Sequence, residues 1–173
     1  MNELRFVVAP LPIYLEIVGE KEDDFTKEYN SLSEFEEDAV GQWLKLAKAR
    51  GETGDSDQVL LALLVELHKK VDQLTAVIKK EERTLLSLAE NATISHINFG
   101  HIKLEEGVLQ EGKRYYSRVL MPVFPKREMA IFFQALSSDV AKITNIHDKD
   151  ERDWSGYVTA RERVMIREMK VKE

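Results

Sequence analysis

The side chains that could bind metal ions or transfer protons are few and scattered in this sequence. Four histidines, at positions 68, 96, 101 and 147, form no pair at helical ligand spacing. His96 and His101 flank an expected turn, but no carboxylate can be assigned beside them to complete a metal site. We find no nucleophile paired with a base, no phosphate-binding loop and no Gly-x-Ser-x-Gly motif. The sequence therefore predicts no catalytic residues, no metal and no cofactor.

An acidic run, Asp148–Asp153, is similar to the opening of a calcium-binding loop. Arg152 occupies the fifth position, where such a loop needs an oxygen ligand, and Asp153 occupies the sixth, where the turn needs glycine. Charge clusters of this kind are usually solvated loops. We expect a loop here, and a second solvated loop at Glu20–Asp24.

Clustered cations are the other candidates for binding, and they suit small anions or an acidic partner. Arg114 and Arg118 lie on an expected strand and share one face with Tyr116. The guanidinium group of arginine binds a phosphate or carboxylate group through bidentate hydrogen bonds. A second cluster comprises Lys79, Lys80 and Arg83. The alternative for the strand is an ordinary solvated face, because the four-residue spacing also arises by chance in a chain with ten arginines.

The charge and composition of the chain limit the classes of protein to which it can belong. The chain of 173 residues is 43% hydrophobic and 32% charged, and it contains no cysteine, which excludes disulfides and fits a reducing compartment. Residues 1–91 carry 11 Lys and Arg against 19 Asp and Glu, a net charge of −8, whereas residues 92–173 carry 14 against 12, a net charge of +2. An acidic excess in the first half argues against nucleic acid polymers as partners.

The first apolar run does not predict a membrane segment. It extends from Leu4 to Val18, is interrupted by Pro10, Pro12 and Glu16, and is shorter than the roughly 20 residues that a membrane span needs. It also lacks the basic leader and cleavage site of a signal peptide. We expect a cytoplasmic protein without membrane insertion.

A long helix expected at residues 57–90 carries the strongest pattern in the sequence. Apolar residues recur there at steps of four and three: Leu60, Leu64, Leu67, Val71, Leu74, Ile78, Leu85 and Leu88. At 1.5 Å per residue such a helix is about 50 Å long, which exceeds the size of a compact domain of this length. The heptad stripe predicts a coiled-coil contact between two or four copies of the chain. The alternative is that the helix packs on its own domain.

Shorter elements surround this helix. We expect one or two edge strands in Leu4–Val18 and a helix from Ser33, which has capping-box spacing with Glu36, to Arg50. Trp43 and Trp154 are expected to anchor the core. After Asn91, six short β-type runs are separated by turn residues, and a helix follows at 161–172. These runs are Thr93–Asn98, His101–Leu104, Tyr115–Met121, Met129–Leu136, Val140–Ile146 and Trp154–Thr159.

These elements predict an α+β protein in two parts. Residues 1–91 would form the N-terminal strand or strands and a helical oligomerisation region, and residues 92–173 a small antiparallel β-barrel with a C-terminal helix.

The order of elements after Asn91 resembles a PilZ domain, the six-stranded bacterial barrel whose typical members bind cyclic di-GMP. The matching features are a strand that reaches Gly100, the Gly112 turn, the run 120–125 in place of a Leu-Pro-x-x-Pro hairpin, and the helix from Arg161. With the heptad helix ahead of it, the whole chain resembles the atypical, tetramer-forming PilZ subgroup. The resemblance implies an adaptor in cyclic di-GMP signalling, in motility, pili or biofilm formation, with another signalling protein as its partner.

The residues that hold the dinucleotide in typical PilZ domains are not retained. The family motif Asp/Asn-x-Ser-x-x-Gly corresponds here to Ser95–Gly100, in which Ile97 replaces the hydroxyl, Asn98 lies outside the motif's fixed positions and only Gly100 is kept. No Arg-x-x-x-Arg precedes the expected barrel. The resemblance therefore implies an adaptor that does not bind cyclic di-GMP. The alternative is a receptor that binds it through Lys79, Lys80 and Arg83, or through Arg114 and Arg118.

Overall fold

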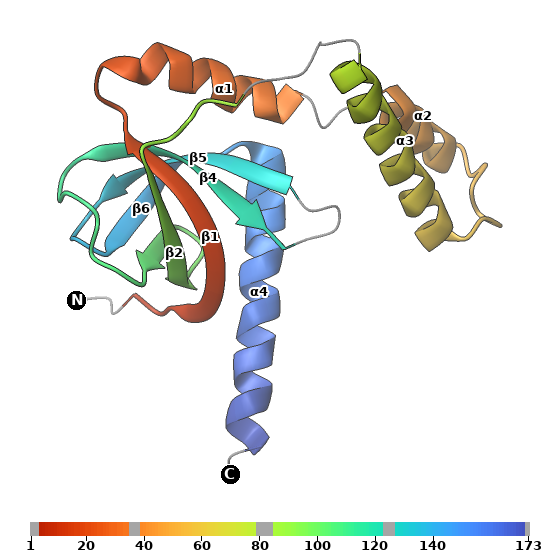
Figure 1. The fold of residues 1–173 in the computed structure, drawn as a ribbon. Coiled ribbons are helices and arrows are strands. Elements are labelled where there is room, and N and C mark those ends of the chain that lie inside the picture. The colour runs from red at the N-terminus through yellow and green to blue at the C-terminus, as the bar shows by residue number, and fades with distance from the viewer. Residues whose placement is uncertain (1–3, 35–38, 79–84, 123–126, 172–173) are drawn as a thin grey trace. The chain divides into compact units, whose positions relative to one another are not determined.

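The computed structural model describes residues 4–34, 39–78, 85–122 and 127–171. The chain divides into two compact units, one of residues 1–33 and 86–173 and the other of residues 34–85. The first unit contains a closed antiparallel β-barrel and a C-terminal helix, and the second contains a pair of helices (Figure 1). The expected α+β class with a small antiparallel barrel is confirmed.

The barrel is built from the six strands of the described residues. They are β1 (Val7–Ile17), β2 (Glu90–Ile97), β3 (His101–Leu104), β4 (Arg114–Met121), β5 (Arg127–Ala135) and β6 (Val140–Asn145). Neighbouring strands follow the order β1-β2-β3-β6-β5-β4, and β4 pairs again with β1. Ile13 of β1 thus faces Ala92 of β2 on one side and Val119 of β4 on the other.

β1 closes the barrel, although the sequence suggested an edge strand in a separate region. Its residues alternate between buried and exposed from Val7 to Leu15, as a strand with one face on a core requires. Pro10 lies where the register with β2 shifts, and Pro12 precedes the first pair with β4, so neither proline interrupts the β1–β4 ladder. The division expected at residues 91 and 92 therefore differs from the one observed, because β1 folds with the strands that follow the helices.

Helix α4 (Asp148–Val171) packs against the barrel core. Trp154 and Val158 are 0% and 1% exposed, and the Trp154 indole Nε1 donates a hydrogen bond of 3.0 Å to the Asn98 carbonyl oxygen. Trp154 is a core anchor, as predicted. The strand expected at Trp154–Thr159 is wrong: these residues lie within α4, where the four-residue step places Trp154 and Val158 on one helix face.

The loop expected at Asp148–Asp153 is also wrong, because these residues form the first turns of α4. Negative side chains near a helix N-terminus are stabilised by the helix dipole. Asp150 and Asp153 both form ion pairs with Arg127 of β5, the first at 2.5 Å. The acidic run therefore fixes the start of α4 to the barrel.

Helix α1 (Glu22–Glu34) lies across the outer face of β4 and β5 and follows a short 3-10 helix, η1 (Gly19–Lys21) (Figure 1). Phe25 stacks on Tyr116 with ring centroids 4.8 Å apart, and Tyr29 lies 5.2 Å from Phe132. The solvated loop expected at Glu20–Asp24 is wrong, because acidic residues form the first turn of α1. The prediction that a helix begins at Ser33 is wrong too, because Ser33 lies inside α1.

The second unit contains α2 (Ala39–Ala49) and α3 (Gln58–Ile78). The Asp57 carboxylate accepts hydrogen bonds from the backbone N–H groups of Val59 and Leu60, at 2.9 and 3.3 Å, and so caps α3. Residues 79–84 lie outside the described part. Residues 85–89 are not helical, so the helix expected to continue to residue 90 is wrong there. Trp43 is 65% exposed, which contradicts its expected role as a core anchor.

Candidate functional site

α2 and α3 pack together through their least exposed residues. On α2, Ala47 is buried and Val40 and Leu44 are half-buried; on α3, Leu61 and Val65 are half-buried. These positions lie on one face of each helix at about 100° per residue. The contact between the two helices therefore uses only one of the apolar faces of α3.

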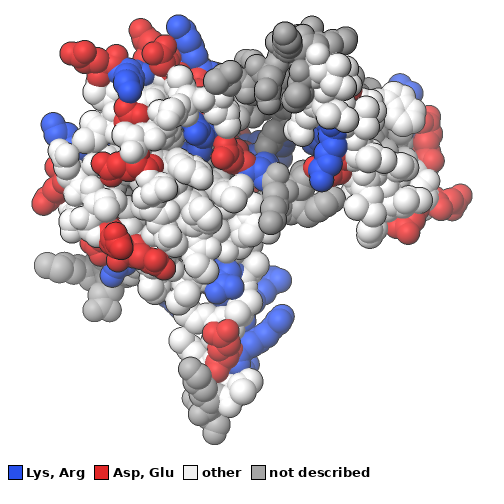
Figure 2. All heavy atoms as spheres, in the orientation of Figure 1, with Lys and Arg blue, Asp and Glu red and all other residues white. Residues whose placement is uncertain are grey.

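The heptad residues of α3 lie on a different face, and they are exposed. We call them the seam: Leu60, Leu64, Leu67, Val71, Leu74 and Ile78, each with 53% to 74% of its surface exposed. Val59 and Leu63, also exposed, widen the apolar surface at the start of α3. Figure 2 shows large uncharged areas on the near surface of this unit. An apolar stripe of this length on one helix is a typical interaction surface.

Two of the eight predicted seam residues do not belong to the seam. Leu85 and Leu88 lie in the non-helical residues before β2. Leu88, with Leu86, packs against the apolar cluster between α1 and the barrel, around Phe25 and Tyr116. The position of Leu88 therefore reflects packing within the barrel unit.

Arg118 of β4 is buried in a polar network under α1. Its Nη1 donates to the Glu28 carboxylate at 2.5 Å and to the Leu86 carbonyl oxygen at 2.9 Å. The Leu86 N–H donates to the second Glu28 oxygen at 2.6 Å, and the Tyr116 hydroxyl donates to the first at 2.8 Å. The network joins α1, β4 and the residues that lead into β2.

The carboxylates of Glu28 and Glu128 lie beside the buried Arg118 side chain and compensate its charge. The Arg118 Nε lies 3.3 Å from a Glu128 carboxylate oxygen, although the contact lacks hydrogen-bond geometry. Burial, reinforced by the Glu28 carboxylate, raises the pKa of the Tyr116 hydroxyl, which stays protonated and donates. The strand face of Arg114, Tyr116 and Arg118 was expected to be solvated or to contact an anion. Instead, α1 covers it, and Arg118 neutralises an internal carboxylate.

Arg114 is more exposed than Arg118, and it too has partners within the unit. Its guanidinium forms an ion pair of 2.7 Å with Glu22, donates to the Asn145 side chain at 3.3 Å, and lies 4.6 Å from the centre of the Phe132 ring. The structure therefore does not bring Arg114 and Arg118 together as a pair of free cations. Lys79, Lys80 and Arg83 lie outside the described residues.

Ser95, Asn98 and Gly100, which the resemblance places in a degenerate nucleotide motif, lie at the turn between β2 and β3. The Ser95 hydroxyl donates to the Lys103 carbonyl oxygen at 3.1 Å. The Asn98 side-chain oxygen accepts from the Gly100 N–H at 3.0 Å and lies 3.2 Å from His101 Nδ1. Burial, and to a lesser degree the charge of Lys142, lowers the pKa of His101. These polar groups are occupied within the hairpin.

His96 and His101 have separate partners. His96 Nδ1 lies 3.0 Å from the Ser95 hydroxyl, whereas His101 lies beside Asn98. Within the described residues, no group of three or more histidine and acidic side chains is placed to hold a metal ion.

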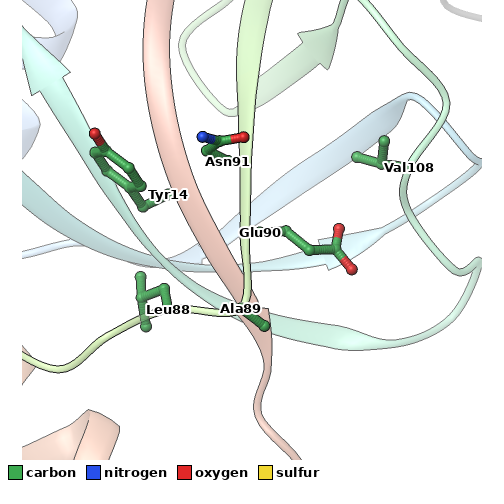
Figure 3. Close-up of a pocket in the computed structure, with 6 residues that line it drawn as sticks. All are labelled: Tyr14, Leu88, Ala89, Glu90, Asn91 and Val108. Atoms are coloured by element: carbon green, nitrogen blue, oxygen red, sulfur yellow. The ribbon is translucent and has the colours of Figure 1, made fainter.

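An open hollow of about 430 Å³ lies on the barrel unit (Figure 3). It is lined by Tyr14, Leu88, Ala89, Glu90, Asn91 and Val108. Figure 3 shows the Glu90 side chain extending from β2 toward the segment that carries Val108. The described residues that line it include a carboxylate and no cationic side chain, so this lining does not suit a dianionic ligand such as a dinucleotide.

The search for a membrane-spanning helix and the comparisons with known proteins gave no positive result. Among the residues that the structure describes, no helix combines the length and apolar character needed to cross a bilayer. No protein-family model, curated protein or solved structure matches the chain significantly.

Proposed function

We propose that this protein is a non-catalytic adaptor that assembles with copies of itself through the seam of α3. The PilZ resemblance suggests that it acts in the bacterial cytoplasm, in cyclic di-GMP-linked signalling that controls motility, pili or biofilm formation. In this role it does not itself bind the dinucleotide. The observation that carries the proposal is the seam, six large apolar side chains on one helix face, each more than half exposed.

The free energy available from covering the seam is comparable in size to the cost of association. Full burial of a side chain such as Leu is worth about 1.5–3 kcal/mol, so covering the exposed half of six side chains on each of two copies is worth on the order of 10 kcal/mol. Association costs roughly 4–15 kcal/mol, and Val59 and Leu63 add further apolar surface. Two or four copies, aligned along α3, would cover the seam.

Two further observations support an adaptor of the PilZ type. A closed antiparallel barrel followed by a helix is the architecture that the resemblance implies. Arg114 and Arg118, one of the described arginine pairs with family-like spacing, are already in ion pairs with Glu22 and Glu28. A ligand would have to break a buried ion pair to use Arg118, which is energetically unfavourable.

Light scattering and calorimetry test the two parts of the proposal separately. Multi-angle light scattering at micromolar chain concentration should return the mass of a dimer or tetramer, and a monomer mass would refute the assembly. Titration calorimetry with cyclic di-GMP should give no binding heat up to millimolar ligand. Heat at micromolar ligand would instead support the alternative, a receptor that binds cyclic di-GMP through Lys79, Lys80 and Arg83 or through Arg114 and Arg118.

A further inference from the structure

One side of β2 is only partly covered by its neighbour in the barrel. β2 has eight residues, whereas β3 has four. The ladder between them begins at Ile94, opposite Leu104. One further backbone hydrogen bond, of 2.9 Å, joins the Glu105 N–H to the Thr93 carbonyl oxygen. Among the described residues, no strand pairs with Glu90–Ala92 on this side, and we call these three residues the open edge.

The backbone of Asn91 faces away from β1 at the open edge. Opposite residues in an antiparallel pair alternate between hydrogen-bonded and non-hydrogen-bonded positions. Thr93 lies opposite Pro12, which has no N–H, and its carbonyl oxygen accepts from the Glu105 N–H instead. Asn91 lies two residues earlier, opposite Tyr14, and has the same orientation. Its N–H and C=O therefore point outward, where an added strand can pair with them.

The open edge is held in place at both ends. Before it, the Ala89 N–H donates a hydrogen bond of 3.2 Å to the Glu16 carboxylate. After it, Thr93 is joined to Glu105. The other side of the same strand is paired with β1. An edge that is already ordered loses little conformational entropy when a partner binds.

The hollow lined by Glu90, Asn91 and Val108 lies along this edge. Val108 follows β3 in the sequence, on the side of β2 that β3 leaves uncovered. Figure 3 shows the Glu90 side chain extending across this space. Glu90 is exposed, and none of the described residues that line the hollow is a cation. The volume of about 430 Å³ is within the range of protein ligand sites.

We propose that the open edge binds an extended segment of a partner protein, and that this segment carries a basic residue. Its backbone pairs with Asn91 as an added strand, and its arginine or lysine lies opposite Glu90. The unpaired N–H and C=O groups select an extended chain, and the carboxylate selects its charge. The proposal rests on the adaptor function, in which α3 joins the copies and the barrel holds the other partner. A contact this short suits a transient complex.

A second copy of the chain is a poorer occupant of the open edge. Charged residues at strand edges oppose pairing between identical strands. Pairing two open edges would bring two Glu90 carboxylates near each other without a cation between them. A segment with a basic residue meets attraction at the same position.

Fluorescence anisotropy of a labelled peptide tests the proposal on the full chain. The probe is a short capped peptide of alternating threonine and valine with a central arginine, a composition that favours an extended conformation. One control peptide has glutamate in place of the arginine. The other keeps the arginine but carries N-methyl groups on the two residues beside it, which removes the donors that an added strand needs.

We expect the arginine peptide to bind and the N-methylated peptide not to bind. Glu90→Gln should weaken binding about two- to fivefold, the range of an exposed ion pair, and Glu151→Gln, at an exposed position of α4, should have no effect. Glu90→Lys should shift the preference to the glutamate peptide. Asn91→Pro removes the outward N–H without removing a bond to β1, so it should abolish binding. The N-methylated peptide tests the same hydrogen bonds from the other side, whether or not Asn91→Pro folds.

Equal binding of the arginine and N-methylated peptides would overturn the proposal, because charge attraction would then act without strand addition. Equal effects of Glu90→Gln and Glu151→Gln, or no binding of any peptide at millimolar chain concentration, would overturn it too. A monomeric chain in light scattering would reject the proposed assembly instead. It would leave this titration readable, because each copy carries a complete open edge.

Discussion

Arg118 on β4 and Glu28 on α1 form a hydrogen-bonded ion pair of 2.5 Å between buried side chains that are 90 residues apart in the sequence. Glu28 also accepts a hydrogen bond from the Leu86 N–H, and Arg118 donates to the Leu86 carbonyl oxygen. The pair therefore fixes both the helix that precedes residues 34–85 and the residue at which the chain returns to the barrel unit.

Removing one member of this pair should destabilise the barrel strongly. Arg118→Met leaves the Glu28 carboxylate buried without its cation, which typically costs about 3–5 kcal/mol. Urea unfolding followed by Trp154 fluorescence in a Trp43→Phe background measures the effect. Arg114→Met is the matched control on the same strand, because its ion pair with Glu22 is exposed and should be worth about 1 kcal/mol or less. Equal losses for the two variants would contradict the structural role assigned to Arg118.

A negative charge in the seam should dissociate the assembly. Leu67→Glu places a carboxylate from each copy into an apolar contact, where unpaired charges are strongly unfavourable. Light scattering should then give the monomer mass. Gln73→Glu adds the same charge to an exposed position of α3 outside the seam, and it should leave the mass unchanged. An intact oligomer in Leu67→Glu would place the contact elsewhere.

The two tryptophans should differ sharply in their tolerance of substitution. Trp154→Phe removes the donor to the Asn98 carbonyl oxygen and part of a fully buried ring, so it should lower the free energy of unfolding by about 1–3 kcal/mol. Trp43→Phe changes an exposed side chain and should be nearly neutral. Chemical denaturation followed by far-UV circular dichroism compares the two without relying on tryptophan emission. A neutral Trp154→Phe would be inconsistent with its place in the core.

Stability should fall on mild acidification in a way that depends on His101. Its pKa is lowered in the folded chain from the ordinary 6.5, so the unfolded chain takes up this proton more readily. The stabilising contribution is therefore complete above pH 6.5 and is lost as the pH falls through the lowered pKa. Between about pH 7 and pH 5 the free energy of unfolding should decrease more steeply in the wild type than in His101→Asn. Parallel curves would show that His101 does not couple folding to protonation.

The barrel could be predicted from the sequence because its inner residues follow the two-residue period of strands. α1 was missed, although Phe25, Tyr29 and Leu32 recur at helical spacing. The charged residues before Phe25 suggested a loop, whereas acidic side chains also favour a helix N-terminus. The near-continuous apolar run Met129–Phe133 was a further signal, because strands buried on both faces lose their alternation.

The heptad spacing of apolar residues indicates a helix face, but it does not show where the helix ends. Six of the eight residues of the heptad pattern lie within α3 and are exposed. Leu85 and Leu88 continue the same spacing but lie in a non-helical segment. For Leu88, packing against the barrel unit overrides local helix propensity. The partner of Arg118 could not be predicted either, since a contact across 90 residues leaves no local pattern in a single sequence.

The position of β1 has a consequence for synthesis. Ile13 pairs with Ala92 and with Val119, so the barrel cannot close until the chain has been translated beyond both partners. At about 5–20 residues per second, roughly 5–20 s separate the synthesis of Ile13 from that of Val119. During this interval an apolar, unpaired strand is a hazard for aggregation between nascent chains. Pro10 and Pro12, which lack N–H donors, reduce the capacity of β1 to pair with a foreign strand before its own partners are made.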